Sequence, residues 1–172
     1  GRGLEFPESP VPTIFLIKYP FKNITKQSVK AYFSEFTLAK NPNLAGLKHL
    51  NRLDYVLATQ ALNQQRDYDE ALLLDSDGHV IEAIVHNLFF VQDDVVCTPD
   101  LSHSGVDGVM RQKILKSLIE SGKNVNIGDF SKQDIRKKYL YSRTLPHPAT
   151  FIKRNLFLVH GTYDERFLIA GD

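Results

Sequence analysis

The sequence predicts one compact domain of the mixed α+β class with a small appendage, built from short antiparallel strands with flanking helices. The first observation is size: 172 residues, of which 42% are hydrophobic, suffice for a substantial core. The second is a series of short apolar runs between turn residues over residues 70–98, which is typical of antiparallel hairpins. The third is a pair of stretches, residues 50–65 and 109–121, whose apolar residues favour helices.

The amino-terminal part predicts two strands with a connector between them. Residues 13–19 are apolar and rich in β-forming side chains, and the prolines before them prevent a helix, so they predict a strand. A polar connector follows at residues 22–27, and residues 29–38 predict the second strand. A domain boundary near Lys22 is expected, which divides the chain into residues 1–22 and 23–172.

The rest of the pattern predicts a helix, a meander and a second helix. Apolar residues recur at steps of three and four in residues 50–65, so this helix is expected to bury one stripe. That stripe consists of Leu50, Leu53, Val56, Leu57 and Ala61. Two hairpins in residues 70–98 predict a meander of short antiparallel strands. A loop at residues 105–108 leads into the helix of residues 109–121, and residues 125–130 predict a further strand.

Composition excludes several classes of function. Cys97 is the only cysteine, so an intramolecular disulfide or a zinc site built from cysteines is excluded, and we expect a small buried strand residue. The histidines lack the spacing of metal ligands. A net charge of +1 indicates no nucleic-acid partner, and no apolar run reaches the roughly 20 residues of a membrane span. We therefore expect a cytoplasmic protein with a small-molecule substrate.

A lysine and a glutamate suggest a site for pyridoxal 5′-phosphate. Such a site needs a lysine that forms a Schiff base with the cofactor and a group that keeps the pyridine nitrogen protonated. Lys48 lies just before the helix of residues 50–65, and Glu82 lies on a predicted strand. These two residues are the candidates, although an ordinary lysine is solvated and an ordinary strand carboxylate is exposed.

Several motifs in the same order resemble those of aminodeoxychorismate lyases, which are fold type IV pyridoxal phosphate enzymes of the class IV aminotransferase superfamily. The resemblance covers residues 13–121, and the segment Lys-His-Leu-Asn-Arg beginning at Lys48 favours the lyases over their aminotransferase relatives. The motifs are residues 43–53, 69–75, 80–82, 87–89, 95–99 and 105–112. The resemblance implies the large domain of that fold, with residues 1–22 as a remnant of the small domain.

The resemblance also implies roles for individual residues. Lys48 would form the Schiff base and then act as acid and base, which requires a desolvated pocket that favours the free amine. Glu82 would pair with the pyridine nitrogen. The backbone amides of Val109 and Met110, at the start of a helix, would bind the cofactor phosphate.

Three further residues have two interpretations each. Arg52 and Asn87 match cofactor-site motifs, but Arg52 also fits a solvated helix residue and Asn87 also fits a residue that closes the bend after Glu82. His49 follows Lys48 closely enough to line the pocket, yet a lone histidine more often satisfies a local hydrogen bond.

The function implied is the conversion of 4-amino-4-deoxychorismate to 4-aminobenzoate and pyruvate, a step of folate synthesis, by a homodimer. The alternatives are a branched-chain or D-amino acid aminotransferase and an inactive, truncated protein of this fold. Family members are longer, so most of the small domain is expected to be missing here. After about residue 135 the sequence departs from the family pattern.

Overall fold

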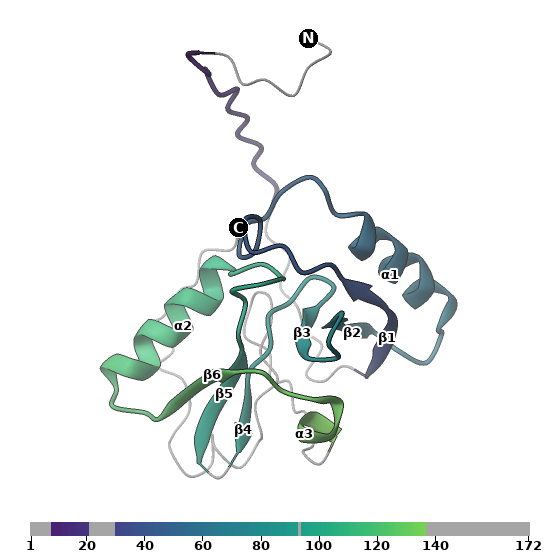
Figure 1. Cartoon of the computed structure of the whole chain (residues 1–172), viewed down its shortest axis with the longest axis vertical. Helices are drawn as coiled ribbons and strands as arrows, with labels where there is room; N and C mark the ends of the chain where they lie inside the picture. The colour runs from purple at the N-terminus through teal and green to yellow at the C-terminus, as the bar shows by residue number, and fades with distance from the viewer. Residues whose placement is uncertain (1–7, 21–29, 93, 137–172) are drawn as a thin grey trace.

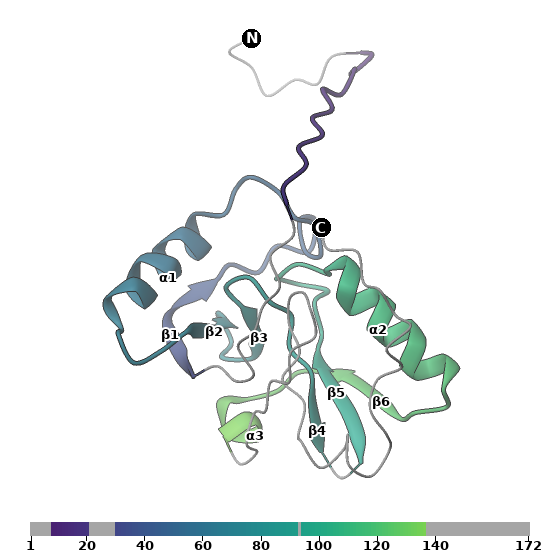
Figure 2. The ribbon, with the colours of Figure 1, turned by 180° about the vertical axis from the view of Figure 1, so that it is seen from behind.

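The computed structural model describes residues 8–20, 30–92 and 94–136. The expected boundary near Lys22, the connector before the second strand and the divergent tail after residue 137 lie outside the described residues. The described chain folds into two small mixed sheets with one long helix beside each (Figures 1 and 2). No helix in the described ranges is long and apolar enough to cross a membrane.

The first sheet has the strand order β1-β2-β3. Its strands are β1 (Ala31–Leu38), β2 (Glu70–Asp75) and β3 (Val80–Ala83), and α1 (Leu53–Gln64) connects β1 to β2. β1 and β2 are parallel, whereas β2 and β3 form an antiparallel hairpin. Helix α1 packs beside β1 and β2 (Figure 1).

The second sheet also has three strands with one antiparallel and one parallel pair, but here the antiparallel pair comes first in the sequence. Its strands are β4 (Phe90–Gln92), β5 (Val95–Pro99) and β6 (Val125–Gly128), in the order β4-β5-β6. Helix α2 (Val109–Glu120) connects β5 to β6, and a short helix α3 (Lys132–Arg136) follows. β4 and β5 are antiparallel, and β5 and β6 are parallel.

The expected fold class is confirmed, but the expectation of a single antiparallel meander is wrong. Each sheet contains one parallel pair, because a helix crosses over between its two strands and returns the chain to the same end of the sheet. Strands β3 and β4, adjacent in sequence, belong to different sheets. The core joins the two sheets, and the rings of Phe90 and Phe130 meet edge to face with their centroids 4.7 Å apart. Cys97 is buried in this core, as predicted.

Helix α1 buries a different face from the one predicted. Ala58 is fully buried and Tyr55 and Leu62 pack on the core, whereas Leu53 and Val56 are 63% and 59% exposed. Both faces of this helix carry apolar residues, so periodicity alone did not distinguish them. The small side chain of Ala58 allows the helix to approach the sheet closely, which decides the orientation.

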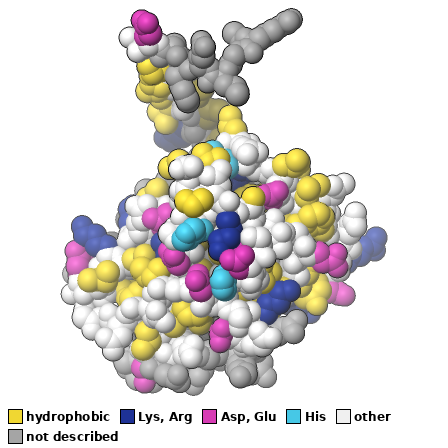
Figure 3. Space-filling model, in the orientation of Figure 1, with side chains coloured by type: hydrophobic (Ala, Val, Ile, Leu, Met, Phe, Trp, Pro, Cys, Tyr) yellow, Lys and Arg dark blue, Asp and Glu magenta, His cyan; other side chains and the backbone are white. Residues whose placement is uncertain are grey.

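The strand predicted at residues 13–19 is absent from the structure. Residues 8–20 form a projecting arm without strand structure (Figures 1 and 3). The side chains of Phe15 and Leu16 are 82% and 96% exposed. A strand is stabilised by hydrogen bonds to a neighbour, and none of the described strands pairs with this segment. The composition of the segment favoured a strand, but composition does not supply a pairing partner.

Replacing Gly105 by alanine is expected to destabilise the fold strongly. Gly105 has φ +85°, and an added Cβ would lie 2.6 Å from Ile81 Cγ2 and 2.9 Å from Leu101 Cδ2. Strained backbone and overpacking together predict a loss of about 2–4 kcal/mol in the free energy of unfolding. Gly78→Ala is the matched control, because Gly78 has the same φ and nothing within 4 Å of the added carbon. Denaturant titrations measure the free energy of unfolding of both variants. An equal loss in Gly105→Ala and Gly78→Ala would contradict the packing argument.

Candidate active site

Two loops that precede helices are joined side by side and form one wall of the site. Gly46 N donates to Gly105 O at 2.9 Å, and Asp107 N donates to Gly46 O at 3.0 Å, in a parallel bridge between Gly46 and Val106. Gly46 adopts φ +79°, a left-handed conformation that glycine accepts without strain. This bridge holds the segment that contains Lys48 against the loop that leads into α2.

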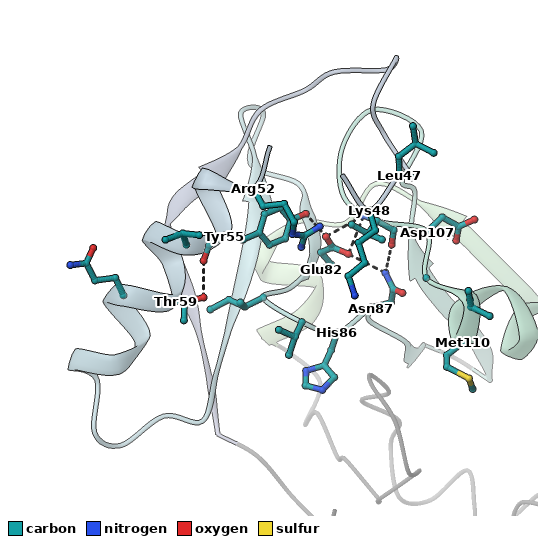
Figure 4. Close-up of a pocket in the computed structure, with 18 of the residues that line it drawn as sticks. Leu47, Lys48, Arg52, Tyr55, Thr59, Glu82, His86, Asn87, Asp107 and Met110 are labelled. Carbon is teal, nitrogen blue, oxygen red and sulfur yellow. Dashed lines mark hydrogen bonds between the residues drawn. The ribbon is translucent and has the colours of Figure 1, made fainter. Parts of the chain in front are cut away.

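A cavity of about 870 Å³ opens beside this bridge, between α1 and the amino-terminal end of α2. Six of the seven candidate residues line it: Lys48, Arg52, Glu82, Asn87, Val109 and Met110. Figure 4 shows Lys48, Glu82 and Asn87 close together in this space. Residues from two loops, one strand and one helix therefore meet at a single cavity, as the sequence predicted.

Glu82 is the most buried acidic group of the cavity, with 3% of its surface exposed. Its carboxylate accepts hydrogen bonds from the Tyr55 hydroxyl and from Val106 N at 3.2 Å. Burial raises its pKa from 4.5 to about 7, although these two bonds and the positive charges of Arg52 and Arg111 act in the opposite direction. Glu82 is therefore not an exposed strand carboxylate but a buried group with a raised pKa.

The raised pKa of Glu82 predicts a pH dependence of stability. The folded protein binds the proton on the Glu82 carboxyl group more tightly than the unfolded chain does. Protonation of Glu82 therefore contributes its full stabilisation to the fold below pH 4.5. The effect is lost as the pH rises to about 7, and it amounts to about 3 kcal/mol. Denaturant titrations from pH 4.5 to 7 should show that the free energy of unfolding of the wild type falls as the pH rises. Glu82→Gln should remove this dependence on pH. An unchanged dependence on pH in Glu82→Gln would contradict the assignment.

Asn87 connects the carboxylate to the loop before α2. Its Nδ2 donates to Glu82 Oε2 at 3.1 Å and to Val106 O at 2.7 Å. An added Cβ at Gly108 would lie 2.5 Å from Asn87 Oδ1, so a larger residue there would displace the Asn87 side chain. The structure thus supports a positioning role for Asn87 beyond closure of the bend after Glu82.

Helix α2 directs its amino terminus at the cavity. Gly108 is its N-cap and makes no side-chain capping bond, and Val109 and Met110, which follow it, line the cavity. The first amides of a helix have no partner within the helix, and the helix dipole makes this end positive. This end of the cavity is suited to an anionic group.

Lys48 departs from one expectation. It lines the cavity with Glu82, but it is exposed and not desolvated. Neighbouring apolar side chains at the rim are also exposed, Leu47 by 56% and Val85 by 66%. The described residues leave the mouth of the cavity open beside the lysine.

The sequence interpretation missed two residues that organise the site. Tyr55 bonds Glu82 and lies under the guanidinium of Arg52, whose Cζ is 3.7 Å from the ring centroid. Arg52 is thus a cavity residue rather than a freely solvated one. Arg111, 7% exposed, lies with Nη1 2.6 Å from Asp107 Oδ1, so it anchors the loop before α2. The sequence offered one signal for Tyr55: it is an aromatic residue with a hydroxyl group, three positions before the small Ala58 on the same helix.

The remaining candidate, His49, does not line this cavity. It lines a neighbouring cavity of about 90 Å³, and its Nδ1 is buried without a partner among the described residues.

Elsewhere, Asp75, Asp77 and His79 place one ligand atom each within 4.8 Å of one another. Lys40 Nζ lies 2.7 Å from Asp77 Oδ2 and 3.5 Å from Asp75 Oδ2, so its ammonium compensates these carboxylates.

Comparison with known proteins identifies the family. The sequence profile of amino-transferase class IV matches residues 1–139, so the chain belongs to the class IV aminotransferase family. The aminodeoxychorismate lyase of Vibrio harveyi is 39% identical over 130 residues, which are 74% of this chain and 48% of that protein. The branched-chain-amino-acid aminotransferase of Escherichia coli K12 is 32% identical over 146 residues, which are 78% and 46%. The chain spans about half the length of these curated relatives.

Solved structures agree with this assignment. The 4-amino-4-deoxychorismate lyase of Pseudomonas aeruginosa has a TM-score of 0.60 at 38% identity, covering 64% of this chain and 40% of that chain. An aminotransferase from Brucella abortus, bound to the cofactor PLP, has a TM-score of 0.62 at 19% identity, covering 74% and 46%. The latter shares the fold. The pyridoxal phosphate class rests on the family match, because class IV aminotransferases are pyridoxal phosphate enzymes.

Proposed function

We propose that the cavity holds pyridoxal 5′-phosphate and that its residues act in the roles expected from the sequence. The observation that carries this proposal is that Lys48 and the buried carboxylate of Glu82 open onto one cavity. A carboxylate offers about four acceptor positions, and Glu82 receives three donors from the protein, which leaves one for the pyridine N–H. The amides of Val109 and Met110 match a phosphate group.

The chemistry divides between the cofactor and the chain. When bound, the cofactor supplies an electron sink for the negative charge that develops at the substrate Cα. Lys48 Nζ is the group that would hold the cofactor covalently and, when freed by a substrate amine, would accept the Cα proton as a general base. Glu82 would hold a proton on the pyridine nitrogen through its carboxylate. Arg52 supplies positive charge beside the same cavity.

The reaction that we propose is the cleavage of 4-amino-4-deoxychorismate to 4-aminobenzoate and pyruvate. Loss of the Cα proton is followed by elimination of the enolpyruvyl side chain, and aromatisation of the ring drives the step. The 39% and 38% identities to two aminodeoxychorismate lyases support this choice. The test is incubation of the chain with cofactor and 4-amino-4-deoxychorismate, followed by quantification of both products.

Branched-chain aminotransferases also match this chain, which makes amino transfer the second candidate. In that reaction, Lys48 would return the proton to the cofactor carbon instead of supporting elimination. Formation of a 2-oxo acid that depends on an acceptor keto acid identifies transfer, whereas pyruvate and 4-aminobenzoate in equal amounts without an acceptor identify the lyase. Neither product, with no cofactor bound, identifies the inactive protein.

We further propose that the chain works in the cytoplasm as a homodimer. Exposed apolar side chains at the cavity support an additional protein surface there, because exposed apolar surface can mark a site where a partner binds. They are Leu47, Val56, Val85 and Val109, with 47–66% of their surfaces exposed. Sedimentation equilibrium tests the assembly: we expect twice the mass of the chain, and the mass of one chain would contradict it.

A further inference from the structure

Tyr55 contacts two charged groups of the cavity with two different parts of its side chain. The hydroxyl donates to Glu82 Oε1. The ring lies 3.7 Å from Arg52 Cζ, within the range of a cation–π contact. Tyr55 itself packs on the buried cluster that contains Ala58 and Leu73, so the core fixes the ring in place.

We propose that Tyr55 is a positioning residue that fixes the carboxylate of Glu82 with its hydroxyl and the guanidinium of Arg52 with its ring face. The two functions separate chemically, because phenylalanine keeps the ring and removes the hydroxyl, whereas leucine removes both. Tyr55 sets the spacing between the acidic and basic groups that face the cavity (Figure 4). This inference deepens the proposed function, but the positioning itself concerns the protein without cofactor.

The protonation of Tyr55 suits this role. Burial and the neighbouring charge of Glu82 raise the pKa of Tyr55, so the phenol remains a neutral donor at physiological pH. A neutral donor stabilises the charged form of the carboxyl group that it contacts. Tyr55 therefore lowers the proton affinity of Glu82 while burial raises it.

Other groups near Glu82 must be held constant in the test. Arg52 and Arg111 lower the pKa of Glu82 through their charges, and Lys48 and His86 line the same cavity. Asn87 and Val106 donate hydrogen bonds to the carboxylate. Tyr55→Phe leaves all of these side chains unchanged, so it isolates the hydroxyl.

The first experiment titrates Glu82 in the cofactor-free chain by infrared spectroscopy with ¹³C-labelled glutamate. The difference between wild type and Glu82→Gln assigns the Glu82 carboxyl band. Tyr55→Phe should raise the pKa of this carboxyl group by about one unit or more, because a hydrogen bond to the charged form is lost. Tyr68→Phe is the control, since Tyr68 contacts Tyr32 outside the cavity, and it should leave the titration unchanged.

The second experiment measures how fast phenylglyoxal modifies Arg52, by mass spectrometry of the same protein. Tyr55→Leu should increase the rate several-fold by removing the ring, whereas Tyr55→Phe should leave it at the wild-type rate. An unaltered Glu82 titration in Tyr55→Phe, or equal Arg52 rates in both variants, would overturn the inference. Both readouts use the cofactor-free chain, so failure of the proposed function would not change them, and Tyr55→Phe remains informative if Tyr55→Leu does not fold.

Discussion

Lys48→Ala is expected to abolish turnover and the absorbance of covalently bound cofactor. No other described lysine lines the cavity, so no neighbouring amine replaces its nucleophilic and basic functions. A positioned general base contributes about 10²–10⁴-fold to the rate, and the covalent bond to the cofactor is lost as well, so we expect a decrease of at least about 10³-fold. Absorbance spectra with added pyridoxal phosphate, recorded beside product assays, measure both effects.

The controls separate the role of the amine from that of the charge. Lys48→Arg keeps the positive charge but offers no amine for the covalent bond, and it should fail as Lys48→Ala does. Lys113→Ala removes an exposed lysine of α2 outside the cavity and should retain the wild-type spectrum. A covalent spectrum that persists in Lys48→Ala would show that another lysine holds the cofactor.

Glu82→Gln is expected to lower turnover about 10- to 150-fold while the chain remains folded. The amide cannot hold the pyridine nitrogen protonated by charge, and a hydrogen bond to a charged group is worth about 1.5–3 kcal/mol. Glutamine has nearly the same shape, and its carbonyl oxygen still accepts from Val106 N. The measurements are kcat, cofactor affinity and thermal unfolding, with the exposed Glu35→Gln on β1 as the control. A variant with normal kcat would remove Glu82 from the proposed mechanism.

The sequence predicted the positions of the long helices and of most strands because their signals are local. Apolar periodicity marked α1 and α2, and turn residues marked the hairpin of β2 and β3. It did not predict which strands pair in parallel, because pairing depends on where the crossover helices return the chain. It also misplaced the buried face of α1, since the close packing at Ala58 depends on the neighbouring sheet and not on the helix itself.

The candidate site was predicted through motifs, and its internal contacts were not. Lys48 and Glu82 are 34 residues apart in sequence, yet they line one cavity because the loops at Gly46 and Val106 pair. When several motifs follow one another in the order found in one family, their residues are expected to lie at the same site. The contacts of Tyr55 have no comparable signal, because a tyrosine on a helix shows its partner only after the strand that carries Glu82 is in place.

The central claim is that one cofactor joins the Lys48 amine while its ring nitrogen faces Glu82. The most direct test is to add pyridoxal phosphate, reduce the covalent adduct with borohydride, and map the modified peptide by mass spectrometry. We expect modification of Lys48 alone in the wild-type chain and none at this position in Lys48→Arg. Modification at a different lysine, or an unmodified chain at saturating cofactor, would contradict it.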